Sequence, residues 1–173
     1  EKNFLKYALF VSYFPQLVAG PIERSTQLLP QLKHLDKIKV WNSDRIRSGA
    51  LVMLYGYFLK MVIADRAALL VDTVFHANYY SQYVGFTTLV GAVLFSIQIY
   101  CDFAGYTYIA IGASKVMGVE LMNNFNTPYL ATSIKDFWDR WHISLTSWFR
   151  DYLYFPLGGS RKGTLRKYVN IMI

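Results

Sequence analysis

An apolar run from residue 84 to residue 114 constrains the fold of this chain more than any other feature. It reads VGFTTLVGAVLFSIQIYCDFAGYTYIAIGAS and contains no Lys, Arg, Asp or Glu before Asp102. At roughly 1.5 Å per residue, a helix over this run is long enough for the ~30 Å hydrocarbon core of a bilayer. We therefore expect residues 84–114 to cross a membrane.

A second apolar run, residues 50–71, reads ALVMLYGYFLKMVIADRAALLV and would span about 33 Å as a helix. It contains Lys60, Asp65 and Arg66, and an unpaired charge at the centre of a bilayer costs on the order of 3 kcal/mol. We expect Asp65 and Arg66 near the outer end, with Lys60 snorkelling or facing a polar cavity. The alternative is that these charges mark a short or tilted helix.

The remaining composition agrees with a membrane protein. Hydrophobic residues make up 54% of the chain, and the charges are gathered in blocks. Residues 4–22 are apolar but contain Pro15 and Gly20-Pro21, which favours a bent or re-entrant segment. The first residue is Glu1, and the apolar run YVNIMI at 168–173 has barely begun at the last residue. We expect an internal fragment, truncated at both ends.

The fold class predicted by these patterns is all-α. It is a multi-pass transmembrane helical bundle with re-entrant or interfacial amphipathic helices, in which residues 1–173 form a single partial membrane domain. Basic stretches at 24–47 and 115–167 flank the two runs, whereas residues 72–83 contain no Lys or Arg. The positive-inside rule places both basic stretches in the cytoplasm. The apolar runs make the lipid bilayer an expected partner, and the expected location is the cell (inner or plasma) membrane. The basic charge matches no nucleic-acid-binding signature, so no nucleic-acid partner is expected.

The segment DFWDRWHISLTSWFRDYLYFPLGG, residues 136–159, combines aromatic and charged side chains. Read as one helix from an N-cap at Ser133, it pairs Asp136 with Arg140 and sets Asp139 beside His142. One face of this helix is then apolar and carries Trp138, Trp141, Leu145 and Trp148. The pattern is typical of an amphipathic helix at a lipid interface.

Two interpretations of His142 remain open from the residues alone. In the first it is an incidental polar residue, hydrogen-bonded to Asp139 on a surface helix. In the second it is a general base at the membrane face, inside a cavity that admits a polar substrate. Burial among rings would lower the pKa of His142 and the Asp139 carboxylate would raise it, so composition does not decide between them.

Three stretches carry a family resemblance. RWHISLTSWFRDYLYFPLGG at 140–159, FPQLVAGPIER at 14–24 and YCDFAGYTYIAIG at 100–112 resemble the membrane-bound O-acyltransferase family, in its bacterial alginate O-acetyltransferase branch. The resemblance covers most of the chain in the family's order. Where the family commonly has an acid in the third stretch, this sequence departs from the pattern and has Tyr108.

The resemblance implies a multi-pass enzyme that takes an acyl group from a cytoplasmic thioester and delivers it towards an extracytoplasmic acceptor. It identifies His142 as catalytic, as the base or as partner of a second histidine. That second histidine belongs to an apolar WHG stretch expected downstream, because His34 and His76 match neither motif. On this interpretation the fragment alone is inactive.

The donor implied by the resemblance is acetyl-CoA or another acyl thioester, with no cofactor bound. The acceptor is a polysaccharide or an extracytoplasmic acetyltransferase partner. Trp141, Arg150 and Asp139 are candidate substrate-binding or donor-binding residues. Arg150 falls eight residues beyond His142, so a continuing helix would return it to nearly the same face. Its alternative role is a structural pair with Asp151 or a headgroup contact.

No metal site is expected, because HxxxH, CxxC and paired-carboxylate spacings are missing from the sequence. Cys101, the lone cysteine, lies in an apolar run where a packed thiol is the default. Two other functions stay open. One is D-alanyl transfer to teichoic acid from a carrier protein, and the other is a noncatalytic, truncated membrane scaffold.

Overall fold

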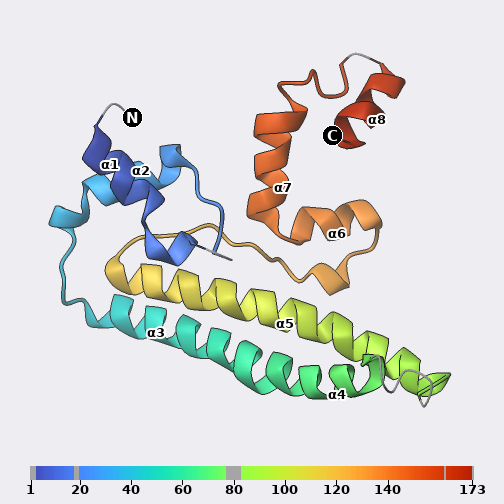
Figure 1. Cartoon of the computed structure of the whole chain (residues 1–173). Helices are drawn as coiled ribbons and strands as arrows, with labels where there is room; N and C mark the ends of the chain where they lie inside the picture. Colours follow the sequence, from blue (N-terminus) through green and yellow to red (C-terminus); the bar gives the residue numbers. More distant parts are fainter. Residues whose placement is uncertain (1–2, 18–19, 77–82, 162, 173) are drawn as a thin grey trace. The chain divides into compact units, whose positions relative to one another are not determined.

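The computed structural model describes residues 3–17, 20–76, 83–161 and 163–172, and the chain forms two compact units (Figure 1). The first unit comprises residues 1–20 and 24–121, and the second comprises residues 21–23 and 122–173. The described residues contain helices and an isolated β-bridge but no named strand. The predicted all-α class is therefore confirmed for this part of the chain, while the single membrane domain stays a prediction.

The first unit contains most of the helical residues. Its elements are α1 (Phe4–Val11), the 3-10 helix η1 (Phe14–Gln16), α2 (Ser25–Lys33), the 3-10 helix η2 (Leu35–Lys37), α3 (Ser43–Tyr57), the π-helix η3 (Phe58–Ala64), α4 (Asp65–Phe75) and α5 (Phe86–Met117). The second unit contains the 3-10 helix η4 (Pro128–Leu130), α6 (Ile134–Arg140), α7 (Ile143–Phe149), the π-helix η5 (Arg150–Tyr154) and α8 (Thr164–Met172).

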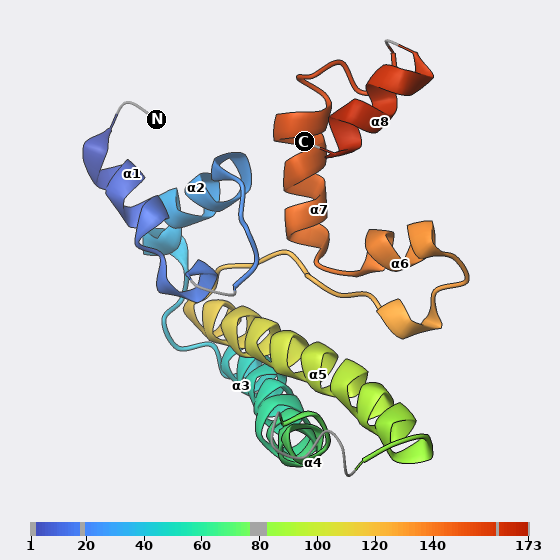
Figure 2. The same ribbon diagram turned by 45° about the vertical axis from the view of Figure 1, so that its right-hand side comes forward.

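One long antiparallel helix pair dominates the first unit. The segments α3, η3 and α4 follow one another without a break, so residues 43–75 are helical throughout. All three pack against α5, as both views show (Figures 1 and 2). The predicted run at 50–71 is therefore helical along its whole length and has a neighbour of similar extent.

Glycines allow the two helices of this pair to approach closely. A Cβ added to Gly49 would lie 2.8 Å from the carbonyl oxygen of Gly112, and one added to Gly56 would lie 2.6 Å from that of Gly105. Such distances leave no room for a side chain. Seven residues separate the glycines on each helix, so both contacts fall on one face, as in helix pairs within membranes.

One end of the pair is fixed by capping groups. The side chain of Asn42 accepts a hydrogen bond from the Arg45 amide at the start of α3, and α5 ends at Gly118 in the left-handed conformation. The Arg45 Nε atom donates to the carbonyl oxygen of Val116 in the last turn of α5 at 3.3 Å. The basic N-terminal end of one helix and the basic C-terminal end of the other therefore coincide.

Among the described residues, α5 is the one helix that by itself is long and apolar enough to cross a membrane. Only 11% of its most apolar window is buried within the protein. Large apolar side chains on α3 to α5, among them Leu54, Met61, Leu70 and Val93, are more than half exposed. Exposed apolar surface of this extent marks a face that contacts lipid or another protein.

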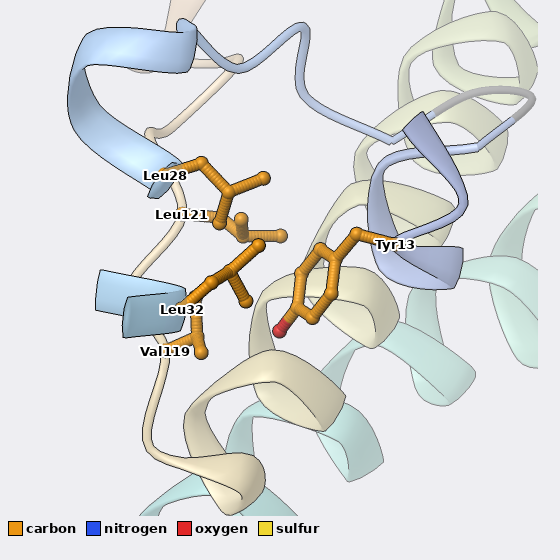
Figure 3. Packing of buried hydrophobic residues seen from close by; sticks show 5 residues of the cluster. All are labelled: Tyr13, Leu28, Leu32, Val119 and Leu121. Carbon is orange, nitrogen blue, oxygen red and sulfur yellow. The ribbon is translucent and has the colours of Figure 1, made fainter. Parts of the chain in front are cut away.

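A small core closes the basic end of the first unit (Figure 3). It consists of Tyr13, Leu28, Leu32, Val119 and Leu121, which come from three separate segments. The hydroxyl of Tyr13 shares a 2.5 Å hydrogen bond with the buried Ser114 hydroxyl. The N-terminal segment is bent as predicted, because α1 ends at Val11 and Pro15 lies in η1. Whether it enters a membrane stays a prediction.

Candidate functional site

The backbone breaks at the candidate histidine. Trp141 is extended, with φ −102° and ψ 129°, and His142 is left-handed, with φ 45° and ψ 53°. The prediction of one helix running from Ser133 past His142 is therefore wrong, since α6 ends at Arg140 and α7 begins at Ile143. The two helices meet at a sharp corner (Figure 2).

The part of the prediction that concerned α6 is confirmed. Ser133 caps the helix by accepting a hydrogen bond from the Asp136 amide at 3.0 Å. Arg140 donates from Nε to the Asp136 carboxylate at 2.7 Å, four residues apart as expected. The predictions that depend on contacts within one helical turn were correct as far as Arg140, where hydrogen bonds to residues 124–126 begin.

Residues 124–126 cause the break by pairing with the chain on both sides of His142. Phe125 and Trp141 form an isolated antiparallel bridge. The Asn126 amide donates to the carbonyl oxygen of Arg140 at 3.0 Å, and the Ile143 amide donates to that of Asn124 at 2.9 Å. Two hydrogen bonds with residues 124–126 compete with helical ones, so the helix cannot continue.

The tryptophans do not form the predicted single face, because that face required an unbroken helix. Trp141 is half-buried, stacked on Phe137 with ring centroids 5.6 Å apart and edge-on to Phe125 at 5.1 Å. Trp138 is 53% exposed and Trp148 is 39% exposed. Trp141 is therefore a packing residue in the corner that presents His142.

His142 is half-buried, and burial lowers its pKa below the ordinary value. Asp139 was predicted to lie beside it, but its carboxylate accepts a hydrogen bond from Lys135 at 2.7 Å, within α6. This contact raises the pKa of Lys135. The break at residues 141–142 removes the helical spacing on which the Asp139–His142 contact depended.

A buried polar network lies directly behind the corner. Ser144 donates to Oδ1 of Asn124 at 2.5 Å and accepts from the Ile22 amide at 3.0 Å. Glu23, next in the chain, accepts from the Met122 amide at 2.6 Å. Burial raises the pKa of Glu23, and the hydrogen bond from Met122 offsets part of that rise.

This network joins two of the motifs that carried the family resemblance. GPIER supplies Ile22 and Glu23, and WHISL supplies Ser144, two residues after His142. Sequence analysis did not identify Asn124, Ser144 or Glu23 as site residues. The available signal was the presence of a carboxylate and a serine inside the resembling motifs, but nothing in the spacing indicated that stretches 122 residues apart would meet.

Arg150 begins η5, and its guanidinium lies 4.0 Å from the Asp151 carboxylate. His142 is the cap residue before α7, and Arg150 is the first residue of a π-helix. The continuous α-helical spacing predicted to return Arg150 to the face of His142 is therefore interrupted. Arg150 lines a cavity of about 520 Å³, together with Thr146, Phe149, Leu153, Tyr154, Asn170, Ile171 and Met172. α8 supplies the last three of these and lies beside α7 (Figure 2).

The third motif, residues 100–112, lies within α5 and contributes residues that contact the other helix of the long pair. Asp102 accepts a hydrogen bond from Lys60 of η3 at 2.5 Å, and Asp65 lies 3.4 Å from the same ammonium. Tyr108 contacts Tyr55 edge-on, with ring centroids 5.2 Å apart. The Cys101 thiol is buried, as predicted. Within the described ranges no cluster of His, Cys, Asp and Glu side chains could hold a metal ion.

Comparison with known proteins places this chain in a family. The model of the membrane-bound O-acyltransferase family matches residues 2–173. A probable alginate O-acetylase of Pseudomonas fluorescens is 40% identical over 172 residues, which is 99% of this chain and 33% of that protein. A peptidoglycan O-acetyltransferase of Helicobacter pylori is 40% identical over 99% of this chain and 32% of its own length.

A teichoic acid D-alanyltransferase of Bacillus subtilis is 33% identical over 84% of this chain and 36% of its own length. The chain thus spans about a third of the length of the curated relatives it matches. The family model nevertheless covers both compact units and all three motifs. The chain belongs to the membrane-bound O-acyltransferase family.

Proposed function

We propose that this chain is part of a multi-pass enzyme of the cell membrane that transfers an acetyl group from a cytoplasmic acyl thioester to a hydroxyl of an exported polysaccharide. His142 is the general base, and it is presented at the corner between α6 and α7. The observation that carries the proposal is the left-handed, half-buried His142, which is hydrogen-bonded through its backbone neighbours to residues 124–126. Strained backbone of this kind is concentrated at functional sites.

The membrane arrangement is supported by the helix pair of the first unit. α5 is long and apolar enough to span a bilayer, and the helical residues 43–75 pack against it. Gly112 contacts Gly49 at one end, and Gly91 contacts Val74 at the other. A second crossing antiparallel to α5 follows, with the basic stretches before α3 and after α5 on the cytoplasmic side.

Lys60 in the first run fits a crossing because it is paired with Asp102 across the two helices. Lys60 contacts both Asp102 and Asp65, so the ammonium is neutralised within the pair. Paired charges facing a neighbouring helix are the form in which ionisable residues occur inside membranes. The alternative of a short or tilted helix is not required by this arrangement.

The chemistry assigned to His142 needs a neutral imidazole. Burial lowers the pKa of His142, so the ring is uncharged at neutral pH and can accept a proton. It takes the proton of the acceptor hydroxyl as the oxygen attacks the thioester carbonyl. The C–O bond then forms, the C–S bond breaks, and the leaving thiolate takes the proton. Positioned acid–base catalysis contributes roughly 10²- to 10⁴-fold.

The cavity beside α7 is the proposed place for part of the donor. Its lining is mainly apolar, and Arg150 adds one positive charge. A guanidinium suits a phosphate on the carrier of the acyl thioester. Trp141 and Asp139 stay candidate substrate-binding or donor-binding residues in the corner, where Trp141 packs on Phe137 and Asp139 is paired with Lys135.

The test is acetylation of the exported polymer by the full-length protein carrying His142→Gln. We expect the acetate released from the polymer by mild base to fall by at least 100-fold at equal membrane abundance. The matched control is His34→Gln, which replaces an exposed histidine after α2 and should leave acetylation unchanged. Normal acetylation by His142→Gln would remove His142 from the mechanism.

D-alanyl transfer to teichoic acid is the second candidate, favoured by the 33% identity to the Bacillus subtilis enzyme. The same variants distinguish the two when mild base hydrolysis is analysed for both acetate and D-alanine. Loss of D-alanine with unchanged acetate would support this second candidate. A protein whose deletion changes neither ester would instead be the noncatalytic scaffold.

A further inference from the structure

Asn124 and Ser144 are fully buried polar residues, and their polar groups face each other. Both have a relative exposure of 0%, and their side chains share a 2.5 Å hydrogen bond. A buried hydroxyl or amide without a partner costs about 1–3 kcal/mol, so such a pair persists only where its geometry is satisfied. The Ile22 amide supplies a further hydrogen bond to Ser144 at 3.0 Å.

These bonds surround a residue whose backbone needs support. His142 lies two positions before Ser144, and its φ of 45° costs a non-glycine residue about 1–3 kcal/mol. The carbonyl oxygen of Asn124 accepts from the Ile143 amide at 2.9 Å. Asn124 therefore holds the chain on the C-terminal side of His142 twice, once through its backbone and once through its side chain.

The neighbouring charges do not replace this support. Arg140 is paired with Asp136, and Asp139 is paired with Lys135, so the ion pairs of the charged groups next to the corner lie within α6. Arg140 also donates to the Thr127 hydroxyl at 3.4 Å, on the N-terminal side of the corner. Glu23 binds the Met122 amide and thereby ties residues 21–23 to the start of the segment that holds Asn124. The support is thus built from residues far from His142 in sequence.

We propose that Asn124 and Ser144 are positioning residues that hold the imidazole of His142 in its reactive orientation, with the Ile22 amide as the third member of the network. This inference rests on the proposed catalytic role of His142. Loss of either side chain lets the backbone at residues 141–143 relax towards helix. The ring then moves relative to the substrate, and a displacement of about 1 Å can lower a rate by as much as 100-fold.

The experiment measures acyl transfer by the full-length protein in membranes as a function of pH, for Ser144→Ala and Asn124→Ala. We expect kcat to fall about 10- to 100-fold with KM changed less than threefold. We also expect the pKa of the rising limb of the pH–rate profile to move up towards about 6.5, because a released ring is better hydrated. Ser144→Thr, which keeps the hydroxyl, should restore at least part of the rate.

Two matched controls are available in the same segments. Ser147→Ala removes a hydroxyl that donates to the Ser144 carbonyl within α7, and Asn123→Ala removes an exposed amide next to Asn124. Both should retain the pH–rate profile and kcat of the unmodified enzyme. The proposal is overturned if Ser144→Ala and Asn124→Ala reduce only the amount of folded protein and leave kcat and the profile unchanged. If His142→Gln is fully active, the proposed function fails first.

Discussion

Gly56 of α3 and Gly105 of α5 face each other across the long helix pair, each with its missing side chain directed at the other's carbonyl oxygen. A Cβ on Gly56 would lie 2.6 Å from the Gly105 oxygen, and a Cβ on Gly105 would lie 2.8 Å from the Gly56 oxygen. The contact is reciprocal, so neither residue can be enlarged without separating the helices. Backbone contact of this kind stabilises helix pairs in lipid, where apolar side chains gain nothing by leaving the solvent.

Gly56→Leu should therefore separate α3 from α5. Forcing extra carbon atoms into a filled contact costs about 1–3 kcal/mol in packed interiors, and rigid backbone on the other side places this case at the upper end. We expect a lower unfolding temperature of the purified protein in detergent. Ala50→Leu, at an exposed position of the same helix, should leave that temperature unchanged. Equal effects of the two substitutions would contradict the glycine contact.

The Lys60–Asp102 pair tests whether residues 43–75 lie in lipid. In water an exposed ion pair contributes about 0–1 kcal/mol, whereas an unpaired charge inside a bilayer costs on the order of 3 kcal/mol. We expect Lys60→Met and Asp102→Asn each to reduce the amount of protein inserted in the membrane. The double variant should recover part of that loss, because each single variant removes half of a pair.

Lys37→Met, in an exposed position of the basic stretch, is the control for the loss of a lysine. It should not change insertion. If the effects of Lys60→Met and Asp102→Asn simply add in the double variant, the two side chains are not coupled, and the pair contributes nothing to the second crossing.

Local signals in the sequence predicted much of the fold. Apolar length predicted the helices at 50–71 and 84–114, and the Ser133 cap and the Asp136–Arg140 spacing were correct because each depends on neighbours within one helical turn. The partner of Lys60 could not be predicted in the same way. It lies on α5, and only the register set by the facing glycines brings Asp102 to it.

The sequence predicted which residue is the candidate base, His142, but not the backbone geometry around it. Family resemblance identified His142, but the helical pattern across Trp138, Trp141 and Trp148 favoured a single helix. The helical spacing of these tryptophans continues across residues 141–142, because the residues before and after the break lie in helices. The interruption comes from Asn124 and Asn126, whose hydrogen bonds to residues 140 and 143 are tertiary contacts with no periodic signature.

Thr127 is a second strained residue, and it allows strain to be separated from function. Its φ of 43° is unfavourable for a β-branched side chain, whose Cβ crowds the backbone there. We expect Thr127→Gly to stabilise the protein by about 1 kcal/mol, seen as a higher unfolding temperature, with transfer activity unchanged. Asn126→Gly, at the neighbouring position with negative φ, should be destabilising by about 0.5–1 kcal/mol. A loss of stability in Thr127→Gly would show that its side chain contributes more than its backbone costs.

Glu23 gives the protein a pH-dependent stability whose sign follows from its burial. Glu23 is buried, with a relative exposure of 8%, and burial raises its pKa above the ordinary value of 4.5 despite the hydrogen bond from Met122. Because the folded protein holds this proton more tightly than the unfolded chain, the resulting stability is fully present below about pH 4.5. It is lost as the pH rises through the raised pKa.

Glu23→Gln keeps an oxygen that can accept from the Met122 amide but carries no charge to desolvate. We therefore expect the variant to match the unmodified protein near pH 4 and to unfold at a higher temperature than it above the raised pKa. The measurement is the difference between the two unfolding temperatures from pH 4 to pH 8. Glu120→Gln, which replaces an exposed carboxylate, is the control and should shift the unfolding temperature little at any pH. A constant difference for Glu23→Gln across this range would mean that the buried carboxyl does not change its protonation on unfolding.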